Sequence, residues 1–211
     1  CVEVTRKKLN KEKFMGIFNV GVTDKKRDKL VYARWQRMLE RCYSPSYKEK
    51  FPSYNGVVVC DDFLYYSKFE AWLKEQDNFC EYINGGRAWA LDKDLFCKEG
   101  KLYSQDTCCL LPAEINGSLV CYRSNGDGTP SGISFQNGCK KFIVSLCING
   151  KNKNLGRFTC QEKAFEAYCV AKDEKIKGLA QKWEECLTTK AYEHLVNYSE
   201  KERSLWYLNS K

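Results

Sequence analysis

The sequence predicts an α+β protein: a first part of mixed helices and strands, then a three-stranded antiparallel sheet packed on one helix, then a helical tail. Two patterns carry this prediction. Apolar residues recur at helical spacing in several separate segments, and in segments 133–136 and 141–148 they alternate with mostly polar ones. With 211 residues, of which 43% are hydrophobic, the chain can bury one good core or two small ones.

The first part of the chain is expected to hold several short elements separated by polar, turn-forming segments. In chain order they are a strand at 14–22, a helix at 30–42, a strand at 57–60, a helix at 63–76, and strands at 89–96 and 108–111. A further helix should begin at Pro112, because proline is favoured in the first turn of a helix.

The clearest division along the chain is a run of turn-forming residues. From Arg123 to Ser131 the sequence is almost entirely Ser, Asn, Gly, Asp, Thr and Pro, which is too polar and too flexible for a helix or strand. The tail has a helical pattern and is expected to dock back onto the body. The predicted domains are 1–121, a linker at 122–130, a sheet domain at 131–178 and a helical tail at 179–211.

Period-two alternation predicts two half-buried strands at 133–136 and 141–148. Asn149-Gly150 is a strong hairpin signal, so a third strand should follow at 153–158. The apolar residues of a helix expected at 161–177 can cover one face of this sheet. The other face should be open and should display Ser134, Gln136, Lys141, Ser145, Lys153 and Arg157.

Positive charge is concentrated in this sheet. The chain has a formal net charge of +8, and segment 131–160 contains five lysines and arginines but no acidic residue. The helix that follows balances acids against lysines. This contrast favours a polyanion as partner. We expect double-stranded DNA, with polar side chains at base edges and cations at phosphates. The residues expected to contact DNA are Ser134, Gln136, Lys141, Ser145, Lys151, Lys153 and Arg157.

Four short motifs of the sheet domain add a family resemblance. They are Ser131-Gly132-Ile133-Ser134, Lys141-Phe142-Ile143-Val144, Asn154-Leu155-Gly156-Arg157-Phe158-Thr159 and Glu162-Lys163-Ala164-Phe165-Glu166-Ala167-Tyr168. The domain resembles the DNA-binding domain of plant ethylene-response transcription factors, which also occurs in phage and mobile-element nucleases. This resemblance implies that the sheet enters the major groove.

Residues 30–119 contain a second set of motifs. They are Trp35, Met38, Arg41, Cys42 and Tyr43; Val59, Cys60 and Phe63; Phe69 and Trp72; and the block Leu91-Asp92-Lys93-Asp94, Tyr103-Ser104, Thr107-Cys108 and Ile115-Asn116. They resemble phage-encoded proteins of the HNH type. In HNH endonucleases two strands and a helix form a ββα-metal finger, so the resemblance implies such a finger with flanking helices.

By this resemblance, Asp92 and Asn116 match the residues that hold a divalent ion, Mg²⁺ or Mn²⁺, on the scissile phosphate. Lys93 stands where the family has its general-base histidine, and Thr107 where it has an orienting asparagine. A lysine with an ordinary pKa of about 10.4 is protonated at neutral pH and cannot take a proton from water. The only histidine, His194, lies in the tail and is expected to be an ordinary surface or packing residue.

Four interpretations of the first domain therefore stay open. In the first interpretation, the domain is an inactive finger that docks on DNA, with Lys93 contacting a phosphate. In the second, it is an active endonuclease of homing type, in which Lys93 stabilises the charge of the phosphate. In a third interpretation, Asp92, Lys93 and Asn116 are only turn and cap residues. The fourth is of another class: a phage inhibitor that binds a host DNA-directed enzyme. Mg²⁺ or Mn²⁺ is expected only if the domain is catalytic, and no cofactor otherwise.

The 13 cysteines indicate a reducing compartment. Their number is odd, and most lie in apolar runs such as Leu146-Cys147-Ile148 and Tyr168-Cys169-Val170. No CxxC pair occurs, so we expect free, buried thiols; a zinc site from scattered cysteines stays an alternative. No stretch approaches the about 18 apolar residues of a membrane span, and the first residues lack a signal-peptide core. We expect a cytoplasmic protein of a bacterial or phage-infected cell, with no membrane partner; the sequence does not identify a protein partner.

Overall fold

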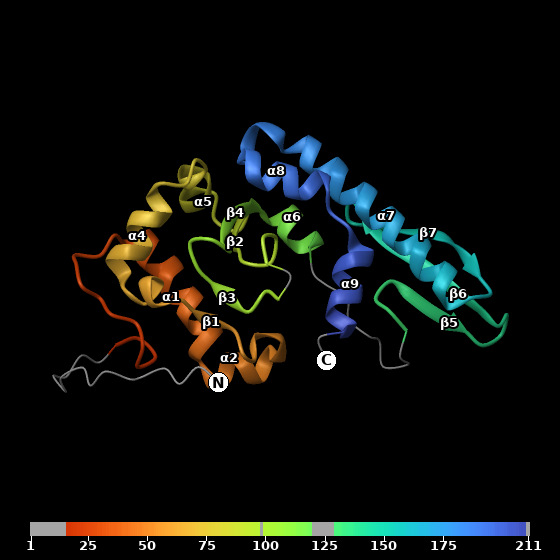
Figure 1. Ribbon diagram of the computed structural model, residues 1–211, viewed down its shortest axis with the longest axis horizontal. Helices are drawn as coiled ribbons and strands as arrows, with labels where there is room; N and C mark the ends of the chain where they lie inside the picture. The colour runs from red at the N-terminus through yellow and green to blue at the C-terminus, as the bar shows by residue number, and fades with distance from the viewer. Residues whose placement is uncertain (1–15, 98, 120–128, 210–211) are drawn as a thin grey trace. The chain divides into compact units, whose positions relative to one another are not determined.

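The computed structural model describes residues 16–97, 99–119 and 129–209 (Figure 1). The fold is α+β and includes a three-stranded antiparallel sheet, as predicted. The chain forms two compact units, 1–71 and 72–211. Most of the linker predicted at 122–130 lies outside the described residues.

The first unit is built around α1 (Lys29–Tyr43). Asp28 caps this helix by accepting two backbone N–H groups of its first turn. The predicted apolar face is buried, and its fully enclosed Trp35 donates the indole N–H to the carbonyl of Phe63 at 2.7 Å. The other elements of this unit are α2 (Pro45–Lys50), the 3-10 helix η1 (Pro52–Tyr54), β1 (Val58–Val59), α3 (Asp61–Leu64) and α4 (Tyr66–Lys74), within which the unit boundary falls.

Three expectations for this unit were wrong. Residues 16–22 form a tight turn closed by hydrogen bonds between Ile17 and Gly21, where a strand was expected. The helix expected at 63–76 is two helices, because the backbone at Tyr65 is extended. Between the helix predicted at 30–42 and the strand predicted at 57–60, only a turn-forming connection was expected. Part of it is the helix α2, which Ser44 caps and in which Pro45 occupies the first turn, where its missing N–H costs nothing.

After the end of α4, the second unit continues with α5 (Phe79–Asn84) and an antiparallel hairpin. In this hairpin β2 (Trp89–Asp92) pairs with β4 (Cys109–Pro112), and β3 (Leu102–Tyr103) lies in the connection between them. A short helix, α6 (Ala113–Ser118), follows β4 directly, with Pro112 as its N-cap.

The three-stranded sheet has the order β5-β6-β7, with β5 (Ile133–Gln136), β6 (Lys141–Ile148) and β7 (Lys151–Phe158). The predicted two-residue hairpin between β6 and β7 is confirmed. Asn149 and Gly150 have φ values of 51° and 74°, and the residues on either side of them pair with each other.

Helix α7 (Gln161–Lys182) joins two hydrophobic cores and is longer than predicted. Its first half lies over the sheet, with Ala164 and Tyr168 in the core beneath it. Its second half packs with α6 and with the tail helices, as Figure 1 shows for the blue helices. One continuous helix therefore crosses the boundary that was predicted at residue 178.

The tail consists of η2 (Glu184–Cys186), α8 (Thr189–Val196) and α9 (Glu200–Asn209). Ala191 and Leu195 are buried in the core shared with α6 and α7, which confirms that the tail docks on the body. Next to this core, the ammonium group of Lys172 on α7 forms an ion pair with Glu200 on α9 at 2.8 Å, and both side chains are buried.

The eleven cysteines among the described residues are free thiols, as expected. Cys80, Cys139, Cys147 and Cys186 are nevertheless exposed, so the expectation that the thiols are buried holds only in part. Within the described portion of the chain, no helix is both long enough and apolar enough to cross a membrane.

Candidate functional site

Cross-strand pairing decides which side chains share the uncovered side of the sheet. Residues paired in an antiparallel sheet point to the same side. Gln136 pairs with Lys141, and Ser134 pairs with Ile143, which pairs in turn with Arg157. These residues lie opposite the side that α7 covers. We call this side the open face and define it by Ser134, Gln136, Lys141, Ile143, Ser145 and Arg157.

A β-bulge in β7 changes the alternation along the first half of this strand. Leu155 is the extra residue, and Asn154 pairs with Ser145. Lys153 consequently pairs with Leu146, which is buried against α7. The expectation that Lys153 lies on the open face was therefore wrong, because one extra residue moves every side chain beyond it to the other side of the strand.

The same bulge places two asparagines, Asn152 and Asn154, on the open face; without the extra residue they would lie on the covered side. The amide oxygen of Asn154 accepts the N–H of Gly156 at 2.8 Å, and the φ of 133° at Gly156 is one that glycine tolerates. The sequence signal for this bulge was the glycine inside a strand. Lys151 and Lys153 remain exposed beside the β6–β7 turn.

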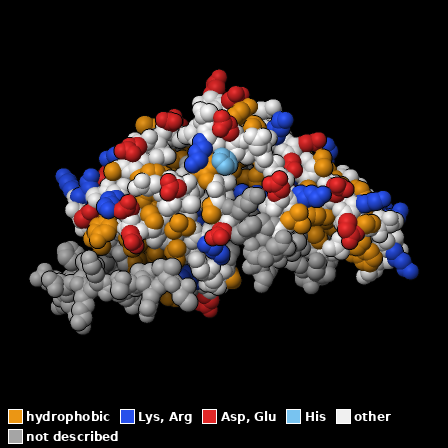
Figure 2. Space-filling model, in the orientation of Figure 1, with side chains coloured by type: hydrophobic (Ala, Val, Ile, Leu, Met, Phe, Trp, Pro, Cys, Tyr) orange, Lys and Arg blue, Asp and Glu red, His pale blue; other side chains and the backbone are white. Residues whose placement is uncertain are grey.

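The two sides of this sheet and helix differ in charge. Residues 129–160 contain no Asp or Glu, and the open face carries Lys141 and Arg157 as exposed cations. On α7, basic and acidic side chains are interspersed, as Figure 2 shows for the surface over that helix. The open face thus carries hydroxyl, amide and cationic groups around Ile143, and this combination suits an anionic partner.

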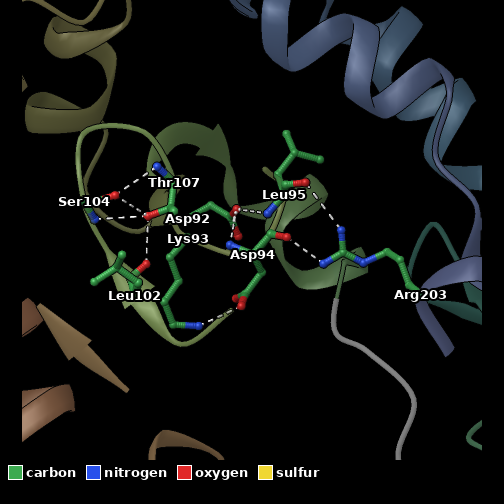
Figure 3. Close-up of polar contacts among 8 residues, drawn as sticks. All are labelled: Asp92, Lys93, Asp94, Leu95, Leu102, Ser104, Thr107 and Arg203. Atoms are coloured by element: carbon green, nitrogen blue, oxygen red, sulfur yellow. Dashed lines mark hydrogen bonds and ion pairs between the residues drawn. The ribbon is translucent and has the colours of Figure 1, made fainter. Parts of the chain in front are cut away.

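The second candidate site is the turn that follows β2 (Figure 3). Asp92 is only 3% exposed, and its Oδ2 atom accepts the N–H groups of Asp94 at 2.9 Å and Leu95 at 2.7 Å. Burial and the nearby charge of Asp94 raise the pKa of Asp92 to about 6. The carboxylate of Asp92 therefore acts as the cap of this turn, and the turn ends β2 four residues before its predicted end.

The side chains of Asp92 and Lys93 point in different directions from the same turn (Figure 3). Lys93 Nζ forms an ion pair with Asp94 Oδ1 at 2.7 Å and lies 5.7 Å from the ring centre of Tyr103. Asp94 thus offsets the positive charge that Lys93 was expected to offer a phosphate. Thr107 is also used locally, since its hydroxyl donates to the carbonyl of Leu102 at 2.8 Å.

Arg203 holds this turn from the tail, and sequence reasoning missed it. Its guanidinium donates to the carbonyls of Asp94 at 2.6 Å and Leu95 at 3.4 Å. The residue lies on α9, whose first turn is fixed by the buried pair of Lys172 and Glu200. A separation of 109 residues between Arg203 and Asp94 left no local pattern that could have revealed the contact.

Asn116 lies on α6 and His194 on α8, two helices that contribute to the same core as Leu95 of this turn. Asp92 pairs with Cys109, which packs in the same core as Ile115, the residue before the half-buried Asn116. His194 is exposed on α8, and its ring centre lies 4.9 Å from that of Phe96. This contact agrees with the packing role expected for the histidine.

The side chains at this turn do not fit a divalent cation in the arrangement observed. Proteins hold Mg²⁺ through one or two carboxylates, and water or phosphate oxygens complete its octahedral shell. Here one oxygen of Asp92 already accepts two backbone N–H groups, and Asp94 is paired with Lys93. Among residues 16–97, 99–119 and 129–209, no group of three His, Cys, Asp or Glu side chains is placed to hold a metal. The arrangement is that of a structural turn.

No protein-family model, curated protein or solved structure matches this chain.

Proposed function

We propose that this protein binds double-stranded DNA through the open face of β5–β7. The observation that carries the proposal is the acid-free face itself, on which Gln136, Asn152, Lys141 and Arg157 stand together while α7 covers the opposite side. Amide side chains can read adenine edges, and lysine and arginine can bind guanine edges or phosphates.

The dimensions of the sheet support this proposal. Strands lie about 4.8 Å apart, so three strands are about 10 Å across, and the major groove is about 12 Å wide. Lys151 and Lys153 follow the β6–β7 turn at the start of β7 and are exposed. From that end of the sheet they can reach the phosphates that border the groove.

The test compares two double variants of the full chain. Lys141→Gln with Arg157→Gln removes two charges from the open face, and Lys163→Gln with Lys177→Gln removes two exposed charges from α7. The open-face variant should bind duplex DNA more weakly. If each cation meets one phosphate, the slope of log affinity against log salt should fall by about 1.8. The α7 variant should keep the native affinity and slope.

Fluorescence anisotropy with a labelled duplex, from about 50 to 200 mM salt, measures both quantities. The proposal fails if the native protein binds no duplex, or if both variants weaken binding equally. Replacing Gln136 and Asn152 by alanine tests base reading separately, because each lost base contact should reduce discrimination by about 1–3 kcal/mol.

A second part of the proposal concerns β2, β4 and α6. We propose that they form a ββα unit of the HNH type, as found in phage-encoded endonucleases, with little or no nuclease activity. Two antiparallel strands followed directly by a helix support the architecture. The use of Asp92 in the turn and of Lys93 in an ion pair with Asp94 argues against catalysis. We propose further that the protein works inside the cell, because the described cysteines are free thiols.

A further inference from the structure

An apolar side chain, that of Ile143, stands in the middle strand of the open face. Its cross-strand partners are Ser134 on β5 and Arg157 on β7. Its neighbours on the same strand and the same side are Lys141 and Ser145. Among the six residues that define the open face, Ile143 alone has a side chain without a polar group.

Its position distinguishes Ile143 from an ordinary surface residue. The core beneath α7 takes the residues on the other side of β6, such as the fully buried Val144, whereas Ile143 lies half-buried among polar side chains. A single apolar residue on a protein surface is common. In the middle of a face that binds DNA, however, binding removes this side chain from water, and it must then meet a chemical group that suits it.

We infer that Ile143 contacts the 5-methyl group of a pyrimidine in the major groove, so that DNA binding by this protein depends on that methyl group. The inference rests on the proposed DNA-binding function and names a base feature that the open face recognises. The base edges in the major groove carry hydrogen-bond donors and acceptors, and the methyl group of thymine is an apolar feature among them. A methylated cytosine carries the same group at the same position.

The neighbours of Ile143 place this contact at base edges. Strands lie about 4.8 Å apart and successive base pairs about 3.4 Å. A side chain on the next strand therefore reaches the same or an adjacent base pair. Arg157, directly opposite Ile143, can bind guanine, and Ser134 on the other side can bond to several base edges. Ile143 thus lies between two side chains that suit base edges, at a distance from the lysines that follow the β6–β7 turn.

The surroundings of Ile143 favour DNA over a protein as the partner. The centre of a protein–protein interface is rich in apolar side chains and poor in charge. Ile143 has Lys141 next to it on the same strand and Arg157 across from it, and residues 129–160 contain no Asp or Glu. Charge complementarity therefore selects a polyanion, and a methyl group within a polyanion is what the major groove of DNA offers.

The test uses the full chain and two pairs of short duplexes that differ only in methyl groups. The first pair is alternating dA-dT and alternating dA-dU, because uracil lacks the methyl group of thymine. The second pair is alternating dG-dC with and without a 5-methyl group on cytosine. Every second base of a methylated strand carries the group, so the target sequence need not be known. Fluorescence anisotropy at about 50 mM salt measures the four affinities.

The native protein should bind the methylated duplex of at least one pair about fourfold more tightly, as expected from the burial of one methyl-sized apolar group. A preference within the first pair identifies thymine as the source of the methyl group, and a preference within the second pair alone identifies methylated cytosine. Ile143→Ser should abolish the preference, because the serine has no apolar end. Ile143→Val keeps a branched apolar side chain and should keep most of it.

Val170 provides the matched control, because it is a β-branched apolar residue on α7 with an exposed fraction of 54%. Val170→Ser should leave the four affinities unchanged, since α7 covers the opposite side of the sheet. Circular dichroism checks folding. If Ile143→Ser does not fold, Ile143→Thr keeps the branched side chain that strands favour and should reduce the preference below the native value.

The outcomes distinguish this inference from the proposed function. If the native protein binds the duplexes without preference within either pair, the inference is overturned and the proposed function stands. A preference that Ile143→Ser retains in full would also overturn it, because the methyl groups would then act through the shape of the DNA or through another residue. If the native protein binds none of the four duplexes, the proposed function and the inference both fail.

Discussion

At the scale of single residues, Asp92 shows how a buried carboxylate can be structural. Its carboxylate accepts two backbone N–H groups, which partly offsets the cost of removing a charge from water. Its pKa is still raised to about 6 from an ordinary value of 3.8, so the folded state binds the proton more tightly than the unfolded state does. The contribution of Asp92 to the free energy of unfolding is therefore most favourable below about pH 4 and is lost as the pH rises to about 6.

Asp92→Asn should remove this pH dependence, because the amide oxygen can still accept both N–H groups and carries no charge. In EDTA, the free energy of unfolding of the native protein should fall by up to about 3 kcal/mol between pH 4 and pH 7 relative to that of the Asn variant. Urea titrations at both pH values measure the difference. The exposed Asp106, changed to Asn, is the control and should leave the pH dependence unchanged. Equal pH dependence of the unfolding free energy in the native protein and the Asp92 variant would show that the carboxylate of Asp92 is not the source of this dependence.

Lys93→His tests whether only a missing base separates this turn from a nuclease. General-base catalysis is worth a factor of about 10²–10⁴, so a competent metal site should gain nicking activity from the histidine. We expect no plasmid nicking in Mg²⁺ or Mn²⁺, from either the native protein or the variant, because the carboxylate of Asp92 is used by the turn. Nicking that Asp92→Ala abolishes would contradict this expectation and restore the endonuclease interpretation.

At the scale of elements, the bulge in β7 decides which residues lie on the open face. Gly156 has a φ of 133°, and a Cβ atom there would lie 3.3 Å from the ring of Phe158. Gly156→Ala should cost about 1–3 kcal/mol of stability and weaken DNA binding, because Arg157 and Asn154 flank the bulge. Gly138 lies in the β5–β6 turn with open space around it, so Gly138→Ala is the matched control. Thermal melting and anisotropy measure the two effects. Equal melting temperatures for the two variants would rule out strain at Gly156.

The ion pair of Lys172 and Glu200 fixes α9 against α7. Lys172→Met leaves the buried Glu200 without its cation and should cost about 3–5 kcal/mol of unfolding free energy. Lys201 forms a longer pair with Glu166 in which both side chains are exposed, so Lys201→Met should change stability by less than about 1 kcal/mol. Urea unfolding of both variants measures the contrast. A similar small loss in both would mean that the buried pair contributes little beyond an exposed one.

At the scale of the whole molecule, the second unit holds together through α7. The core around its second half includes Leu111, Ile115 and Leu119, which precede the predicted linker. A fragment of residues 129–211 lacks these side chains, so its tail should melt at a lower temperature and less cooperatively than in residues 72–211. Circular dichroism melting of both fragments tests this. Equal melting temperatures would support the predicted boundary at 122–130.

The sequence was most informative where the pattern is local. It predicted α1 through the apolar spacing that ends in Cys42, the hairpin at Asn149-Gly150, and the cover of the sheet by the first half of α7. Each depends on residues close together in the chain, and their propensities agree with the fold. It failed at the ends of elements: the turn at Asp92 shortened β2, and the extended backbone at Tyr65 divided a helix, since in each case a few backbone hydrogen bonds outweighed the hydrophobic pattern.

By itself, then, the sequence determined the fold class, the three strands and their helix, and the acid-free character of the segment that forms the open face. The tertiary structure alone decided which side of β7 each residue takes, that Asp92 and Lys93 serve a turn, and that Arg203 reaches this turn from α9. The physical reason is the separation along the chain between the residues that determine each feature. Alternation and helical spacing are set by neighbouring residues, whereas a bulge depends on the partner strand and a buried contact across 109 residues depends on the packing of whole helices.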